Sequence, residues 1–336
     1  MRLARNSAAL LALISKRADE FFRHLPGIRD GQPDSVHEAR VACRRLRELL
    51  PIVGEDRDAV RAYHVLTEAG RELGRVRDLD VMTDLLAKAE SVVPAAALAI
   101  ALLRRAVLAR LREQRRALVK SLEHLELARV SALRKRPHLH SRSLTLAIVA
   151  DPRSESMLRD RIGQRAQKLR TAVEHAAGVY FPHRLHATRI AVKKLRYAVE
   201  VALDIGVWTP PHLLGDLRKI QTILGDMHDN QVLVERVKEF IDQTVPREET
   251  AVLVSILTAD IARLHAEYLT KRNRLMAIAG ACERFSIDRK TRRLIIAATG
   301  SLAATSAVAI PVALALFKNR RPPIPTERIL TEAAAV

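Results

Sequence analysis

Apolar residues along this chain recur with the spacing of buried helix faces. Their positions repeat at intervals of three and four residues, which predicts amphipathic α-helices rather than strands. The pattern places helices at about residues 6–24, 35–52, 57–74, 78–91 and 95–132, and then at 154–177, 184–206, 212–225, 229–243 and 247–285. Gly74 and Gly225 suit helix C-termini. Asp78 and Asp229 suit the N-caps of the helices that follow, so we expect no chemical role for them.

The helical periodicity is interrupted once in the middle of the chain. Between Pro137 and Pro152 it breaks at two prolines and a patch of serine and arginine, which is typical of a linker. We therefore predict a first helical half at residues 1–136, a linker at 137–153 and a second helical half at 154–285. Residues 286–336 form a separate hydrophobic C-terminal segment with basic flanks.

The two halves carry the same two motifs in the same order. In the first motif, residues 36–47 read VHEARVACRRLR and residues 185–196 read LHATRIAVKKLR, at a constant offset of 149. In the second motif, residues 73–81 read LGRVRDLDV and residues 224–232 read LGDMHDNQV, at an offset of 151. Two motifs with nearly the same offset indicate that the chain is a duplication.

Each copy of the first motif places basic side chains on one face of its helix. At about 100° per residue, each set lies within roughly 80°. The two stripes are His37, Arg40, Arg44 and Arg47, and His186, Arg189, Lys193 and Arg196. Like charges four residues apart destabilise a helix, so a repeated stripe of one sign favours anion binding over an ordinary solvated face. Arg45 and Lys194 flank the stripes, and Tyr197 lies close to the second.

The overall charge agrees with an anionic partner. Lysine and arginine total 57 and aspartate and glutamate total 38, which gives a net charge of +19. A surplus this large requires counter-anions, so nucleic acid, polyphosphate or an acidic membrane is the expected kind of partner. The N-terminus has no cleavage pattern of a signal peptide, and we expect a cytoplasmic protein.

The residue types in the stripes do not favour catalysis or metal binding. Cys43 and Cys282 lie far apart without metal-like spacing, which argues against a zinc site or a disulfide scaffold. The stripes offer no hydroxyl or carboxylate to act with His37 or His186. Neighbouring cations disfavour a protonated imidazole until an anion arrives. We therefore expect anion binding, with no catalytic residue, metal or cofactor.

The duplicated pattern H-x-x-R-[VI]-x-x-[RK]-[RK]-L-R, followed in each half by L-G-x-x-[RH]-D, resembles the CHAD (conserved histidine α-helical domain) family. The resemblance covers about residues 5–285. It implies an all-α fold of two helical bundles related by a pseudo-two-fold axis, with a central basic cavity. It also implies binding of inorganic polyphosphate, and localisation of some members to polyphosphate granules. Nothing here resembles the CYTH domain of many relatives, so we expect a stand-alone member.

The resemblance also implies an anion-binding set at the matching positions. That set is His37, Arg40, Arg44, Arg45, Arg47, His186, Arg189, Lys193, Lys194, Arg196 and Tyr197. Further cations on other helices extend it as a secondary set: Lys16, Arg165, Lys168 and Lys219. The first copy has Glu48 where the second has Tyr197, which predicts unequal halves.

A hydrophobic segment follows the second half. Residues 294–317 contain no charge and are bounded by arginine and lysine on both sides, which suits a membrane anchor. The alternative is a buried or granule-associated helix that pairs copies of the chain through its small residues, giving a homo-oligomer. The expected location is the cytoplasm, with the granule or the inner face of the membrane as further sites.

Three functions remain open at this point. The first is non-catalytic binding of inorganic polyphosphate, to which Arg gives forked contacts and Lys point charges. The second is nucleic-acid binding, disfavoured because Phe, Tyr and Trp, the usual base-stacking platforms, make up only 3% of the chain. The third is a phosphohydrolase or phosphoryl-transfer role, disfavoured because the stripes lack clustered carboxylates for Mg²⁺.

Overall fold

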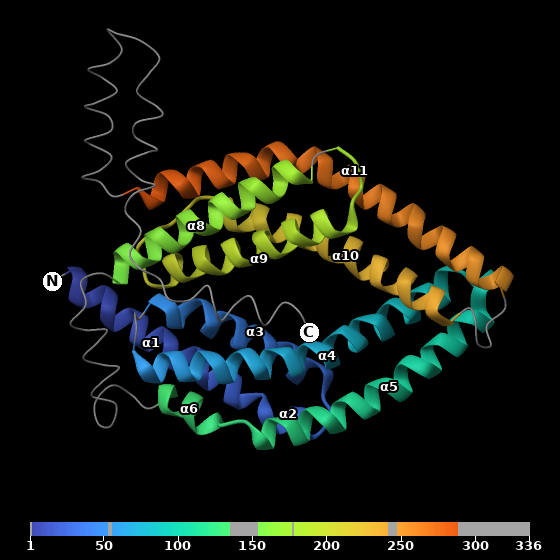
Figure 1. The fold of residues 1–336 in the computed structure, drawn as a ribbon, viewed down its shortest axis with the longest axis horizontal. Helices are drawn as coiled ribbons and strands as arrows, with labels where there is room; N and C mark the ends of the chain where they lie inside the picture. Colours follow the sequence, from blue (N-terminus) through green and yellow to red (C-terminus); the bar gives the residue numbers. More distant parts are fainter. Residues whose placement is uncertain (1, 53–55, 135–153, 177, 241–246, 288–336) are drawn as a thin grey trace, which may run out of the picture. The chain divides into compact units, whose positions relative to one another are not determined.

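The computed structural model describes residues 2–52, 56–134, 154–176, 178–240 and 247–287. Within these ranges the chain is helical and contains no strand, which confirms the all-α prediction. The first half comprises α1 (Arg2–Arg23), α2 (Leu25–Arg29), α3 (Pro33–Leu49), α4 (Arg57–Val92), α5 (Ala97–His124) and α6 (Leu127–Ser131). The second comprises α8 (Ser154–His175), α9 (Pro182–Asp204), α10 (Leu213–Phe240) and α11 (Arg247–Ser286) (Figure 1).

Two predicted segments lie outside the described residues. These are the linker at 137–153 and the hydrophobic segment at 294–317. Among the helices that are described, none has the combination of length and apolar character needed to cross a membrane.

The long helices α4 and α10 correct two predicted helix ends. Both run without a break through the second motif, so Gly74 and Gly225 do not end helices and Asp78 and Asp229 are not N-caps. A glycine inside a helix costs only about 1 kcal/mol relative to alanine, which packing on neighbouring helices offsets. The cap of α4 is instead Asp56, whose side chain accepts hydrogen bonds from the next residues' backbone amides.

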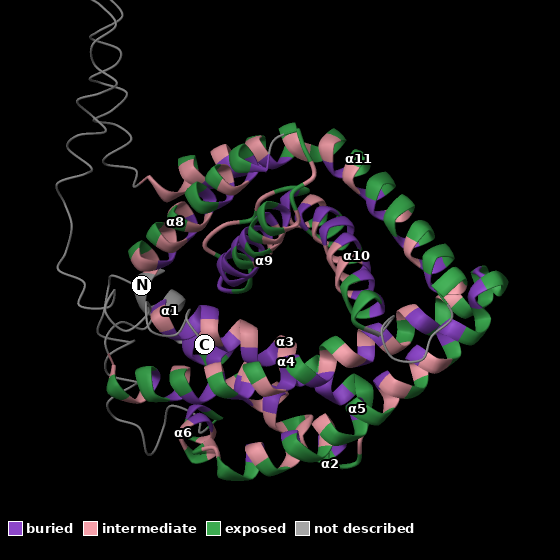
Figure 2. Cartoon of the chain, turned by 45° about the vertical axis from the view of Figure 1, so that its right-hand side comes forward, coloured by how far each residue is buried: buried purple, intermediate pink, exposed green. Residues whose placement is uncertain are grey.

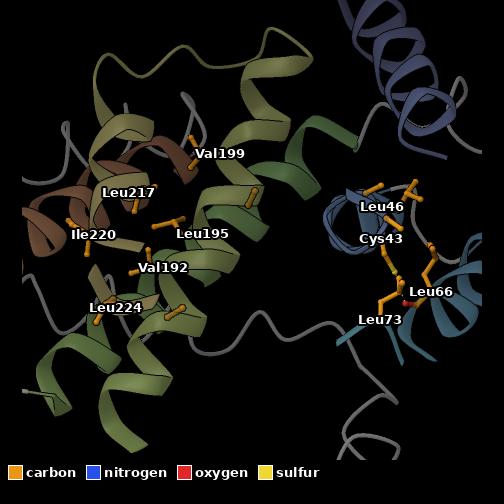
Figure 3. Close-up of a cluster of buried hydrophobic side chains, with 14 of the residues drawn as sticks. Cys43, Leu46, Leu66, Leu73, Val192, Leu195, Val199, Leu217, Ile220 and Leu224 are labelled. Carbon is orange, nitrogen blue, oxygen red and sulfur yellow. Dashed lines mark hydrogen bonds between the residues drawn. The ribbon is translucent and has the colours of Figure 1, made fainter. Parts of the chain in front are cut away.

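The apolar faces predicted for the motif helices are buried, and the two cores use matched residues. Figure 3 shows the first-half core and the second-half core as separate groups. On the motif helices, Cys43 and Leu46 correspond to Val192 and Leu195, and on the next helices Leu66 and Leu73 correspond to Leu217 and Leu224. Equivalent side chains therefore fill equivalent places in each bundle.

The contacts between the halves follow a two-fold pattern. Each half contributes one helix to every pair: α1 packs against α8, α3 against α9, α4 against α10 and α5 against α11. The helices in each pair occupy the same place in their own halves, which is what an isologous contact about a two-fold axis requires. The predicted pseudo-two-fold relation is present within the compact unit that ends at Ser286.

Helix α9 is enclosed more completely than the amphipathic pattern suggested. It packs against α8 and α10 of its own half and against α3 of the other. Residues 195–202 are all buried, and buried stretches of α9 are seen in purple in Figure 2. A helix with partners on several sides has less surface in contact with solvent, and polar residues of α9 such as Arg196 and Glu200 are therefore buried.

Candidate functional site

Four cations from the two motif helices meet where α3 packs against α9. Arg40 and Arg44 come from α3, and Arg189 and Lys193 come from α9. All four are partly buried and act on one another electrostatically across the contact between the halves. The offset of 149 makes Arg40 the counterpart of Arg189 and Arg44 the counterpart of Lys193. Residues near a two-fold axis lie close to their own counterparts, so the duplication doubles the charge here. We call these residues the central basic cluster.

In each half, the aspartate of the second motif lies beside an arginine of the first motif. The Arg40 guanidinium donates to Asp78 at 3.2 Å, and Arg189 lies 3.7 Å from Asp229. The two carboxylates reach the cluster because α4 and α10 continue past the positions where we predicted helix ends. The prediction that these aspartates only cap helices is therefore wrong. Their carboxylates orient the two arginines of the central basic cluster.

A steric reason for the glycine of the second motif is found in the first half only. A Cβ atom at Gly74 would lie 3.4 Å from the Arg40 guanidinium nitrogen Nη2, so the missing side chain leaves room for that guanidinium. A Cβ atom at Gly225 would meet nothing within 4 Å. The structure does not explain why the second copy keeps a glycine.

The central basic cluster holds more positive charge than its carboxylates neutralise. Burial and the neighbouring Arg44 lower the pKa of Arg40 to about 10. Burial, Arg44 and Arg189 lower the pKa of Lys193 to about 6, far below its ordinary value. Burial also lowers the pKa of Arg189, although Asp229 opposes that shift. The site therefore favours the arrival of an anion, which would compensate charges that now repel one another.

The two motif histidines lie at the edge of the cluster. Burial, followed by the charge of Arg77, lowers the pKa of His37. Burial, followed by the charge of Arg189, lowers the pKa of His186. This is the effect expected of imidazoles beside cations. Each ring then becomes a better proton acceptor once an anion is bound.

The structure adds two basic residues that the sequence analysis did not select. His228 of α10 contacts His186, with their Nδ1 atoms 3.3 Å apart and ring centroids 4.5 Å apart. Arg77 of α4 acts on His37. Arg77 and His228 hold the same position in the second motif, the [RH] of L-G-x-x-[RH]-D. A basic residue at this position in both copies is the sequence feature that could have identified Arg77 and His228 as site residues.

Arg45 and Arg47 of α3 have other partners. Arg45 lies 3.8 Å from Glu200 of α9, across the contact between the halves. The Arg47 guanidinium stands over the Tyr63 ring, 5.6 Å from its centroid. Both arginines are partly exposed, so they can extend an anionic contact at the rim of the cluster.

Arg196 and Tyr197 are not brought to the central basic cluster. Arg196 is buried, donates to Gln221 at 2.8 Å and to Glu200 at 2.5 Å, and covers the Tyr197 ring at 4.3 Å. Tyr197 itself is buried. The amphipathic pattern of α9 placed Arg196 on the stripe, but its guanidinium is held by Gln221 of α10 and by Glu200 of its own helix.

A second group of cations surrounds Glu48, where α3 meets α8. Glu48 is buried and pairs with Arg161 at 2.8 Å and with Arg165 at 3.1 Å. Burial, followed by the charges of Arg165 and Lys168, lowers the pKa of Lys194, although Glu48 raises it. Glu48, which stands where the second copy has Tyr197, therefore joins the two halves through ion pairs with α8. Lys194 lies within the electrostatic reach of Arg165 and Lys168, so these three cations form one basic group beside Glu48.

The other secondary candidates stand apart. Lys16 and Lys219 are exposed, and no contact among the described residues joins them to the central basic cluster. Within the same described ranges, no group of three or more His, Cys, Asp or Glu side chains has the arrangement of a metal site.

Replacing Lys193 by methionine is expected to stabilise the free protein by about 1–4 kcal/mol near neutral pH, because folding then no longer has to remove a proton from the Lys193 amine. Since the pKa of Lys193 is about 6 when folded and 10.5 ordinarily, the folded chain binds fewer protons, and stability falls as pH drops through that interval. The advantage of Lys193→Met should therefore shrink toward high pH. Thermal unfolding without phosphate measures it.

The control for this experiment is Lys271→Met on the exposed surface of α11. It removes the same charge without relieving the central basic cluster, and should leave the unfolding temperature nearly unchanged. A Lys193→Met protein that unfolds no later than wild type would show that Lys193 carries no electrostatic strain.

Comparison with known proteins agrees with the fold and the motifs. Two solved structures are similar: "Crystal structure of the CHAD domain from the plant Ricinus communis" (22% identity, TM-score 0.54, covering 82% of this chain and 91% of that one) and "PptA from Streptomyces chartreusis" (14% identity, TM-score 0.56, covering 79% and 98%). At these identities they show the fold alone. No curated protein matches the chain. The family model described as CHAD domain matches residues 12–238, and the chain therefore belongs to the CHAD family.

Proposed function

We propose that this protein binds inorganic polyphosphate at the central basic cluster and does not catalyse its turnover. The observation that carries the proposal is the meeting of Arg40, Arg44, Arg189 and Lys193 between α3 and α9. Their mutual repulsion in the free protein is relieved by a ligand that brings several negative charges to one place. The family resemblance supports the same ligand.

Polyphosphate suits this site better than single-stranded nucleic acid. Nucleic-acid sites of that kind usually offer aromatic faces on which bases stack. Tyr63 has the Arg47 guanidinium over its ring, and Tyr197 is buried with the Arg196 guanidinium over its ring. Guanidinium, ammonium and imidazole groups remain, and these recognise phosphate oxygens without needing a base.

Binding without turnover is supported by the pairing of the nearby carboxylates. Mg²⁺-dependent phosphoryl transfer needs carboxylate oxygens that are free to hold the metal. Asp78 and Asp229 instead face Arg40 and Arg189. The ligand would therefore be held by cations and released unchanged.

Competition between two polyanions tests the proposal. Long-chain polyphosphate should displace a fluorescent single-stranded oligonucleotide from the full chain at a concentration, counted in phosphates, about tenfold or more below that needed with unlabelled oligonucleotide, a difference of ~1.4 kcal/mol. Equal potency, or stronger displacement by the oligonucleotide, would contradict polyphosphate as the preferred ligand. In parallel, incubation of polyphosphate with Mg²⁺ and the protein should release no orthophosphate above a protein-free control. Release that scales with protein concentration would contradict the non-catalytic part.

A further inference from the structure

The two halves of the site share one layout but carry different kinds of charge. At two matched positions, the first half has Arg44 and Arg77 where the second has Lys193 and His228. Guanidinium groups stay protonated in proteins, whereas ammonium and imidazole groups lose their protons when they are buried among cations. At these two positions, the first half therefore carries permanent charge and the second half carries titratable charge.

The contact between His186 and His228 is not compatible with a positive charge on both rings. Their Nδ1 atoms lie 3.3 Å apart, so one nitrogen must donate its proton and the other must accept with its lone pair. Two imidazolium rings would each present an Nδ1–H and repel one another. The observed contact thus belongs to a pair that is not doubly protonated. Adding protons would separate the rings and turn both toward a phosphate as donors.

Lys193 lies where an added charge is least tolerated. Arg40 and Arg44 approach it from α3 and Arg189 approaches from its own helix, with Asp229 of α10 as the opposing charge. Its pKa of about 6 agrees with that environment. In the free protein near neutral pH, the amine is therefore largely uncharged.

We propose that the second half of the site is a proton-coupled anion clamp, in which Lys193 and the His186–His228 pair stay largely uncharged until a polyphosphate segment binds and then take up protons from solution. The inference rests on the proposed function. It makes the first half, with Arg44 and Arg77, the permanently charged entry side. The second half then tightens as the ligand neutralises its surroundings.

The groups that face His228 support this direction of proton flow. His186, Arg189 and Lys193 of α9 all lower its pKa after burial, to about 4. On its own helix Asp229 is its neighbour, and Asp229 is turned to Arg189. From α4, Asp78 acts on Asp229. From α11, Asp260 is held by Asn230, and no charged group of α11 is among those that shift His228.

The sign of the pH dependence follows from these shifts. The free site has lowered pKa values at Lys193, His186 and His228, and a bound polyanion raises them. The complex then holds more protons than the free protein, so affinity rises as pH falls. Lys193 couples first, well above neutral pH, and the histidine pair joins near its ordinary range.

Proton uptake can be measured directly by titration calorimetry of the full chain with long-chain polyphosphate. At each pH, the binding heat is measured in several buffers that differ in ionisation enthalpy, and the slope gives the protons taken up. We expect about one proton per binding event near pH 8.5, from Lys193, and about two near pH 6.5, where the histidine pair contributes. Lys193→Arg should abolish the uptake near pH 8.5. His228→Arg should remove about one proton near pH 6.5.

Both replacements copy the residue that the first half already has at the matched position. The reciprocal variant, Arg44→Lys with Arg77→His, should raise the uptake above that of wild type. Lys271→Arg with His124→Arg changes the same residue types at exposed positions of α11 and α5, and should leave the uptake unchanged.

The outcomes separate this inference from the proposed function. Wild-type protein that binds polyphosphate without proton uptake at either pH would overturn the clamp and leave the proposed function standing. Uptake near pH 8.5 that survives Lys193→Arg, or uptake near pH 6.5 that His228→Arg does not lower, would also overturn the clamp. Absence of any polyphosphate binding by wild type would overturn the proposed function, and the clamp with it.

Discussion

Raising the salt concentration from about 50 mM to about 200 mM is expected to weaken polyphosphate binding about 1,000-fold. The structure places four matched pairs of basic residues in or beside the central basic cluster: His37 and His186, Arg40 and Arg189, Arg44 and Lys193, and Arg77 and His228. By analogy with single-stranded nucleic acid, contacts to about eight phosphates give a log–log slope of about −5 to −6. Such a slope produces the expected loss.

Affinity measured at four or more salt concentrations gives that slope. A shallow dependence would show that few cations touch the ligand, which would contradict the central basic cluster as the binding surface. The slope should also be steeper near pH 6 than near pH 8.5, because more groups of the second half are protonated in the complex and pair with phosphates there. Denaturant unfolding at the same salt concentrations controls for any loss of folded protein.

Much of the fold followed from the sequence because the relevant signals are local or repeated. Helical periodicity fixes which residues of α3 and α9 are buried, and the prediction held at residues such as Cys43 and Val192. The duplication contributes a further constraint, since equivalent motifs must occupy equivalent places. The pairing of α3 with α9 and of α4 with α10 is what that constraint gives once the halves associate.

The second motif was misjudged for a physical reason. Glycine followed by aspartate is common at the junction of two helices, so the local pattern predicts a helix boundary between Gly74 and Asp78. That pattern cannot show that the Arg40 guanidinium of α3 lies against Gly74 of α4 and donates a hydrogen bond to Asp78. Both needs arise from contacts between residues more than thirty positions apart, which local propensity does not contain.

The stripe on α9 was misjudged at one end for a similar reason. Helical spacing alone puts Arg196 in line with Arg189, but it cannot tell which part of a polar face a neighbouring helix covers. Arg196 donates to Gln221 of α10 and forms a buried ion pair with Glu200. The end that carries Arg189 and Lys193 stays partly open. The candidate site therefore narrows to one end of each stripe.

Removing either half of the central basic cluster is expected to weaken polyphosphate binding by at least about 100-fold, because two charge-assisted contacts of roughly 1.5–3 kcal/mol are lost. The variants are Arg40→Ala with Arg44→Ala on α3, and Arg189→Ala with Lys193→Ala on α9. Both should stay folded, since each relieves repulsion within the cluster. Calorimetric or fluorescence titration, with circular dichroism and thermal unfolding beside it, measures both effects.

The matched control is Arg71→Ala with Arg75→Ala on the exposed face of α4, which removes the same net charge. It should change the affinity far less than either cluster variant, because distant charges are screened in solution. A control as damaging as the cluster variants would mean that net charge alone attracts the ligand. A folded cluster variant that binds like wild type would mean that its half does not contact the ligand. If both cluster variants lose binding while the control keeps it, the ligand must bridge α3 and α9, which is why the chain needs both copies of its motif.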